Sequence, residues 1–143
     1  MFSASFVRAA DNQGPAQAAQ KLFDAMRAHD RAAVSALFIP GSTVASVDAD
    51  SKVSVMPAED FATRVGNGKG DWLERIWNPQ VLEHGSIAVV WAEYDFHLNR
   101  KFSHCGIDSF SMLKTASGWK IAGVSDTREV SGCRPSPLGP PTQ

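Results

Sequence analysis

Apolar positions recur at helical spacing near the start of the chain and alternate with polar positions in its second half. Across residues 15–38 the apolar residues follow one another three or four positions apart, which predicts a helical hairpin. Asp30 lies in its tight joint, where it can cap the second helix. A proline and a glycine at 40–41 end the hairpin, and β-branched residues alternating with small polar ones predict a first strand at 42–49.

Strands dominate the pattern after one more helix. Pro57 suits a first helical turn and two acidic residues follow it, so residues 57–65 are predicted to be a short third helix. A glycine-rich loop comes next. Four strands are then predicted, over residues 72–85, 86–98, 102–115 and 118–129. Their short joints require antiparallel neighbours, so the order ααβαββββ indicates an α+β fold with helices on one face of the sheet.

The chain has the length of one domain. Its 143 residues suffice for a single core and are too few for two ordinary domains. We expect a flexible N-terminus at 1–14, a single domain at 15–130 and a proline-rich, disordered tail at 131–143.

Charge and cysteine content narrow the function classes. With 14 basic and 15 acidic residues the net charge is -1, which argues against nucleic acid or anionic membranes as partners. No apolar run approaches the roughly 20 residues of a membrane span, and the first residues lack the pattern of a signal peptide, so a cytoplasmic location is expected. Cys105 and Cys133 are accordingly expected to be free thiols, with one bridge between them as the alternative.

Four stretches, taken in their order along the chain, resemble one known superfamily. They are "RAHDRAAVSALF", "STVASVDA", "WAEYDFHLNRKFSHCGIDSFSML" and "SGWKIAGVSDTR". This order is similar to that of the nuclear transport factor 2-like superfamily, the cystatin-like α+β cone, which includes ketosteroid isomerases, polyketide cyclases and scytalone dehydratase. The resemblance implies that a strongly curved, mostly antiparallel sheet wraps around the N-terminal helices and leaves a conical cavity.

The strand at 102–115 is similar, without a gap, to the isomerase strand that carries an acid donating a hydrogen bond to the substrate oxygen. Asp108 falls on that acid, which an apolar pocket keeps protonated in the isomerases. Because alternate residues of a strand share a face, the cavity side would carry His104, Gly106, Asp108, Phe110 and Met112. The alternative for Asp108 is a solvated carboxylate on an exposed face.

The rest of the isomerase catalytic set is absent. Ser46 stands where the isomerases have their proton-shuttling aspartate, and Leu22 stands where they have a tyrosine. The resemblance therefore implies a related pocket, lined by Ser46 and Leu22, and argues against the same chemistry.

His104 and Tyr94 are further candidates for moving a proton. The reference pKa of histidine lies closest to neutrality, although His104 would serve equally well as a structural residue. Hydrophobic alternation places Tyr94 on the inner face of its strand, together with Phe96, whereas the ungapped likeness to the isomerases favours Asp95. We follow the alternation.

The last predicted strand carries Trp119, Ile121, Gly123, Ser125 and Thr127 on one face, and the resemblance turns that face inward. Gly123 would then leave room for a ligand, and Ser125 and Thr127 would offer hydroxyl groups. The alternative is that Trp119 and Ile121 fill a core and that Gly123 marks a bulge.

These observations predict a small-molecule pocket protein, acting as an isomerase, dehydratase or cyclase on an apolar carbonyl compound. The predicted catalytic residues are Asp108, His104 and Tyr94, and the predicted substrate-binding residues are Phe110, Met112, Gly123, Ser125, Thr127, Ser46 and Leu22. The alternative is a non-catalytic ligand-binding or homodimerisation module. Trp72 and Trp77 would close the mouth of the pocket, and the alternative is that they are core or dimer contacts. The expected partners are a small hydrophobic ligand and a second copy of the chain; neither a cofactor nor a metal is expected.

Overall fold

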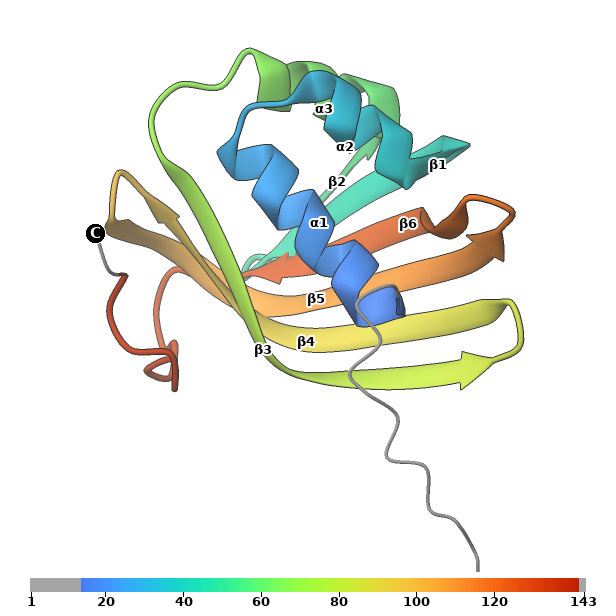
Figure 1. Ribbon diagram of the computed structural model, residues 1–143. Coiled ribbons are helices and arrows are strands. Elements are labelled where there is room, and N and C mark those ends of the chain that lie inside the picture. Colours follow the sequence, from blue (N-terminus) through green and yellow to red (C-terminus); the bar gives the residue numbers. More distant parts are fainter. Residues whose placement is uncertain (1–13, 142–143) are drawn as a thin grey trace, which may run out of the picture.

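The computed structural model describes residues 14–141, in which three helices pack on the concave side of one curved six-stranded sheet (Figure 1). The predicted flexible segment 1–14 lies outside the described residues except for Gly14. The helices are α1 (Pro15–Arg27), α2 (Arg31–Leu37) and α3 (Ala58–Gly66). The strands are β1 (Phe38–Asp48), β2 (Val53–Pro57), β3 (Trp72–His84), β4 (Ile87–Leu98), β5 (Lys101–Thr115) and β6 (Gly118–Arg128).

The sheet order is β2-β1-β6-β5-β4-β3, and every neighbouring pair is antiparallel except β1 and β6. The α+β architecture is confirmed, with one strand more than expected. The additional strand, β2, pairs with β1 after a turn in which Asp48 Oδ1 accepts hydrogen bonds from the amides of Asp50 and Lys52. We missed it because its valines are exposed at the sheet edge and a helix begins directly after Pro57.

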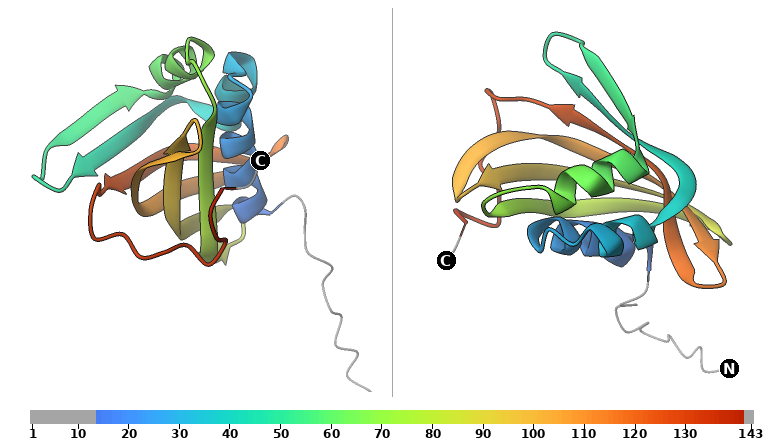
Figure 2. Two further views of the ribbon diagram at one scale, coloured as in Figure 1. Left: turned by 90° about the vertical axis from the view of Figure 1, so that its left-hand side faces the viewer. Right: turned by 90° about the horizontal axis from the view of Figure 1, so that it is seen from above.

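Helix α1 lies across the concave face and supplies the centre of the core. Its apolar stripe includes Leu22, Phe23 and Met26, all buried, and the ring of Phe23 meets that of Phe110 on β5 edge-on at 6.0 Å. Asp30 caps α2 as expected, since its carboxylate accepts a hydrogen bond from the amide of Ala33. The views in Figure 2 show that α1 covers one part of the concavity, while α3 and the β1–β2 hairpin rise over another.

A bulge in β6 decides which side chains enter the concave side. Ile121 pairs with Met112 and Gly123 pairs with Ser111, so β6 contains one extra residue, Ala122, at this point. The extra residue reverses the alternation, and from Val124 onward the even-numbered residues face inward. The expectation that the cavity is lined by Gly123, Ser125 and Thr127 is therefore wrong. The alternative is right: Trp119 and Ile121 lie in the core, and the bulge at Ala122 directly precedes Gly123.

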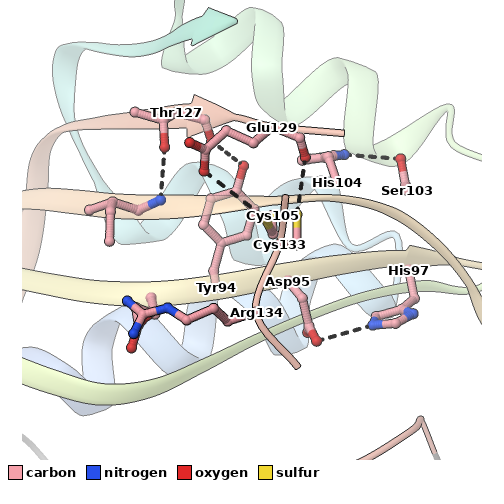
Figure 3. Close-up of a disulfide and its surroundings, with 12 residues drawn as sticks. Tyr94, Asp95, His97, Ser103, His104, Cys105, Thr127, Glu129, Cys133 and Arg134 are labelled. Carbon is pink, nitrogen blue, oxygen red and sulfur yellow. Dashed lines mark hydrogen bonds and ion pairs between the residues drawn. A yellow bond between two sulfur atoms is a disulfide. The ribbon is translucent and has the colours of Figure 1, made fainter. Parts of the chain in front are cut away.

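The segment after β6 folds back over the outer face of the sheet. The backbones of Glu129 and Cys105 exchange two hydrogen bonds, and Cys133 then forms a disulfide with Cys105 (Figure 3). Further along, Gly139 accepts a hydrogen bond of 2.8 Å from Arg75 Nη1. The expectation that Cys105 and Cys133 are free thiols was wrong. The expectation of a disordered tail was wrong for residues 131–141. A disulfide within a fold is typical of oxidising compartments, so it argues against the cytoplasmic expectation.

Removing this disulfide should lower stability substantially. It closes a loop with a sequence separation of 28, for which the chain-entropy relation gives a stabilisation of about 3.6 kcal/mol. We expect Cys133→Ser to lower the free energy of unfolding by about that amount in urea denaturation. Dithiothreitol should lower the wild type to the level of the variant and leave the variant unchanged. Equal stability of the two proteins under oxidising conditions would contradict the structural role of the bridge.

Candidate functional site

A cavity of about 340 Å³ lies between the sheet and helices α1 and α3. Every strand and two of the three helices contribute to its wall. The apolar lining residues are Leu22, Phe23, Met26, Val44, Met56, Phe61, Trp72, Tyr94, Phe96, Leu98, Phe110 and Val124. The polar lining residues are Ser46, Arg64, Glu74, Ser103, His104, Asp108, Asp126 and Arg128. A mostly apolar wall with a few convergent polar groups is the usual composition of a small-molecule site.

Three acidic side chains meet inside this cavity. Asp108 on β5 lies directly opposite Asp126 on β6, and Glu74 reaches from β3 to form a side-chain hydrogen bond with Asp108. Asp108 is only 2% exposed. Acidic residues are rarely buried without a partner, so three of them in one apolar pocket form an uncommon and chemically specific arrangement.

Glu74 and Asp108 both favour their protonated forms. Two carboxyl groups form a hydrogen bond with each other only when one of them carries hydrogen. Burial raises the pKa of Glu74 to about 8, although its hydrogen bond with Asp108 acts in the opposite direction. Burial, followed by the charge of Glu74, raises the pKa of Asp108 well above its ordinary value. Both shifts favour the protonated forms, so one hydrogen can lie between the two carboxyl groups while the second is offered to a ligand in the cavity.

Asp126 has a different environment. Burial raises its pKa, but a hydrogen bond of 2.9 Å from Ser46 Oγ to Asp126 Oδ2 and the charge of Arg128 oppose that shift. These two partners favour the carboxylate form and offset part of the rise, but the pKa of Asp126 stays above its ordinary value. Among the described residues, Asp126 Oδ1 and Asp108 Oδ2 are buried oxygens that no protein group bonds. Buried polar atoms nearly always have partners, so these two oxygens are available to a ligand.

His104 is a neutral side chain at the same cavity. Its ring stacks on Phe96 at 5.0 Å, and its Nδ1 lies 2.9 Å from Ser103 Oγ and 3.3 Å from Arg128 Nη2. Burial, and then the charge of Arg128, lowers the pKa of His104 to about 4. Since a guanidinium only donates, Nδ1 is the accepting nitrogen and the hydrogen is on Nε2. At neutral pH His104 offers a donor rather than a positive charge.

Tyr94 faces the cavity side, as the hydrophobic alternation predicted, but its hydroxyl group is engaged by the backbone. It donates a hydrogen bond of 2.6 Å to the carbonyl oxygen of Thr127 (Figure 3). Burial raises the pKa of Tyr94. On the intervening strand, a Cβ at Gly106 would lie 2.2 Å from the same carbonyl oxygen, so only glycine permits this approach.

The structure brings most of the predicted site residues together. Those that line the cavity are Leu22, Ser46, Tyr94, His104, Asp108 and Phe110. Met112 is fully buried in the core and does not line it. Trp72 lines the cavity, whereas the indole nitrogen of Trp77 donates to Glu93 and the residue lies outside it.

Sequence reasoning missed five polar lining residues, namely Arg64, Glu74, Ser103, Asp126 and Arg128. Glu74 could have been found, because it lies between Trp72 and Ile76 at alternate positions of one strand. Asp126 and Arg128 could not, because the bulge in β6 places them inside.

A second charged cluster lies on the outer face of the sheet, beneath residues 133–141. Arg75 binds the carboxylate of Asp95 with two hydrogen bonds of 2.9 and 2.6 Å, and His97 Nε2 lies 3.2 Å from Asp95 Oδ2. Burial acts to raise the pKa of Asp95, but the bonds from Arg75 and the neighbouring His97 outweigh it and lower the pKa. This cluster anchors the C-terminal segment through the Arg75–Gly139 hydrogen bond.

Two further properties concern residues 14–141 alone. None of their helices is long and apolar enough to cross a membrane. No group of three or more histidine, cysteine, aspartate or glutamate side chains in this part of the chain is placed to hold a metal ion.

Comparison with solved structures identifies the fold. No family model and no curated protein matches the sequence. An NTF2-like protein of unknown function from Shewanella baltica OS155 is 18% identical, with a TM-score of 0.60 over 85% of this chain and 91% of that one. An NTF2-like superfamily protein from Salmonella enterica serovar Typhimurium is 17% identical, with a TM-score of 0.63 over 82% and 89%.

A member of the NTF2-like family from Streptomyces avermitilis, whose name proposes a dehydratase, is 13% identical, with a TM-score of 0.64 over 79% of this chain and 91% of that one. At these identities the likeness is one of fold. The resemblance inferred from the four sequence stretches is thereby confirmed: this chain has the NTF2-like, cystatin-like fold.

Proposed function

We propose that this protein is an acid–base enzyme acting on an apolar carbonyl compound, as an isomerase, dehydratase or cyclase. The observation that carries the proposal is the pair of unpartnered buried oxygens, Asp108 Oδ2 and Asp126 Oδ1, on directly opposed strand positions at one cavity. One belongs to the protonated Glu74–Asp108 pair, and the other to Asp126, whose ionised form is favoured by Ser46 and Arg128. Carboxyl groups with such separated properties are the usual arrangement for acid and base work in one site.

The proposed reaction starts with proton removal from a carbon next to the carbonyl. Asp126 Oδ1 takes the proton, the electron pair of the broken C–H bond forms a C=C bond, and the carbonyl oxygen becomes an enolate. The protonated Glu74–Asp108 pair donates a hydrogen bond to that oxygen as its charge develops. In a β,γ-unsaturated ketone, Asp126 returns the proton to the γ carbon of the dienolate and gives the conjugated isomer. In a β-hydroxy ketone, the enolate electron pair re-forms the C=O bond and makes a C=C bond as the hydroxyl group takes the proton from Asp126 and leaves as water.

The wall of the cavity supports an apolar substrate. Phe23, Phe61, Phe96 and Phe110 present ring surface around the acids, and α1 and α3 limit the access of water. Exclusion of water strengthens hydrogen bonds to a developing charge. The name of the Streptomyces protein is consistent with this class of chemistry but describes that protein alone.

Exchange of hydrogen for deuterium tests the proposal without knowledge of the natural substrate. We expect the wild-type protein in D₂O to accelerate exchange at the carbons next to the carbonyl of 2-tetralone or 5-phenylpentan-2-one, followed by NMR. Asp60→Asn, which removes an exposed acid from the first turn of α3, is the matched control and should exchange at the wild-type rate. Binding of these ketones with no acceleration would reject the enzyme.

The alternative is a ligand-binding or homodimerisation module, and one observation favours the dimer. The outer face of the sheet exposes Leu82, Ile87, Val89, Trp91 and Leu113, with Trp91 51% exposed. Apolar patches of this kind commonly mark protein contacts. We propose that a second copy covers this face, which sedimentation of the intact protein tests directly. Dimerisation is compatible with either role of the cavity.

A further inference from the structure

We propose that the substrate carries an anionic group, such as a carboxylate, and that Arg64 and Arg128 bind it at one end of the cavity. The inference rests on the proposed function, since it concerns a ligand of the same cavity. It narrows the substrate from an apolar carbonyl compound to an oxo acid whose apolar body lies among the aromatic residues.

The first observation is that the charge of Arg64 has no counter-ion among residues 14–141. Arg64 extends from the last turn of α3, lines the cavity and is exposed. It takes part in none of the ion pairs or side-chain hydrogen bonds found among residues 14–141, unlike Arg27, Arg75 and Arg134. A guanidinium at the wall of an apolar cavity is well suited to bind a carboxylate with two parallel hydrogen bonds.

Arg128 and His104 provide further donors on the neighbouring strands. Arg128 Nη2 lies 3.3 Å from His104 Nδ1, which leaves the hydrogen of His104 on Nε2. Both residues line the cavity. Arg128 also faces the acids, because its charge lowers the pKa of Glu74 and Asp126. It is therefore shared between the acids and the ligand, whereas Arg64 is free for the ligand alone.

The strand positions of Arg128 and His104 give an approximate length for the ligand. Arg128 is two positions from Asp126 on β6, which corresponds to about 7 Å along a strand. His104 is four positions from Asp108 on β5, or about 13 Å. An anionic group bound by the arginines would thus be separated from a carbonyl at Asp108 and Asp126 by a chain of several carbons.

A charged and an uncharged form of one probe test this inference. The probe is 4-benzoylbutyrate, an aryl ketone with a carboxylate three carbons from its carbonyl, and the comparison is its primary amide. By calorimetric titration we expect the wild type to bind the acid about tenfold more tightly than the amide, as expected for one charge-assisted interaction. Arg64→Gln should remove most of this preference while leaving amide affinity unchanged. Arg31→Gln, an exposed arginine on α2 outside the cavity, is the charge-matched control and should keep it.

The outcomes separate this inference from the proposed function. Equal affinity for acid and amide, a preference that survives in both Arg64→Gln and Arg128→Gln, or no binding of the acid would overturn it. If the wild type binds the acid and the amide equally and accelerates deuterium exchange equally in both, the proposed enzyme activity is supported and the anionic substrate is rejected. If binding of the acid depends on Arg64 but deuterium exchange is not accelerated, the anion site is supported and the enzyme activity is rejected.

Discussion

Replacing Asp126 by asparagine is expected to reduce the rate of carbonyl-directed deuterium exchange by about a thousandfold, within the range that loss of a general base usually gives. The amide keeps the size of the side chain and can still bond Ser46 Oγ, so the fold and the cavity should persist. What it cannot do is accept a proton from carbon. The measurement is the exchange rate of 2-tetralone in D₂O, with ketone affinity recorded alongside.

The matched variant is Asp108→Asn, on the strand position opposite Asp126. An asparagine amide still donates a hydrogen bond to a developing enolate, so this variant should lose less activity than Asp126→Asn. Equal losses would point to a site that has been disordered rather than to separate acid and base roles. An Asp126→Asn protein that exchanges at the wild-type rate would reject Asp126 as the base.

Replacing Glu74 by glutamine should change how stability depends on pH. The pKa of Glu74 is raised from 4.5 in the unfolded chain to about 8 in the fold, so folding favours the protonated form. The stability contributed by this group is fully present below pH 4.5, declines as pH rises and is lost above about pH 8. Glutamine does not ionise and should not show this decline. At pH 8 the variant should therefore be the more stable protein, by on the order of a few kcal/mol.

Urea denaturation of both proteins at intervals between pH 4.5 and 8 measures this difference. Glu83→Gln, on the exposed end of the same strand, is the control and should follow the wild type at every pH. Parallel curves for Glu74→Gln and the wild type would show that the carboxyl of Glu74 is not perturbed by burial and its acidic neighbours.

Local signals predicted the fold well, because each depends on residues close in sequence. The cap at Asp30, the amphipathic stripe of α1 and the alternation along β4 lie within single elements, and all three are confirmed. The disulfide and the ordered C-terminal segment depend on tertiary contacts instead. Cys105 and Cys133 are brought together only after β6 returns along β5, and nothing within either local sequence indicates it.

The same distinction between local signals and tertiary contacts explains which site residues could be predicted from the sequence. Asp108 and Phe110 could be placed because alternation holds along this part of β5. In β6 one extra residue turns Asp126 and Arg128 into the cavity in place of Ser125 and Thr127. A bulge does not change composition or periodicity enough to be recognised in one sequence. Its chemical consequence is large, because it brings the proposed base to the cavity.

The most direct test of the account is carbon-13 NMR titration of the side-chain carboxyl groups, with Glu74→Gln, Asp108→Asn and Asp126→Asn used to assign the signals. We expect the Glu74–Asp108 pair to stay protonated at neutral pH and to lose its first proton near pH 8, and we expect Asp126, whose ionised form Ser46 and Arg128 favour, to ionise at a lower pH than the pair. Titration of all three groups near their ordinary values would contradict the protonated pair and, with it, the proposed acid–base site.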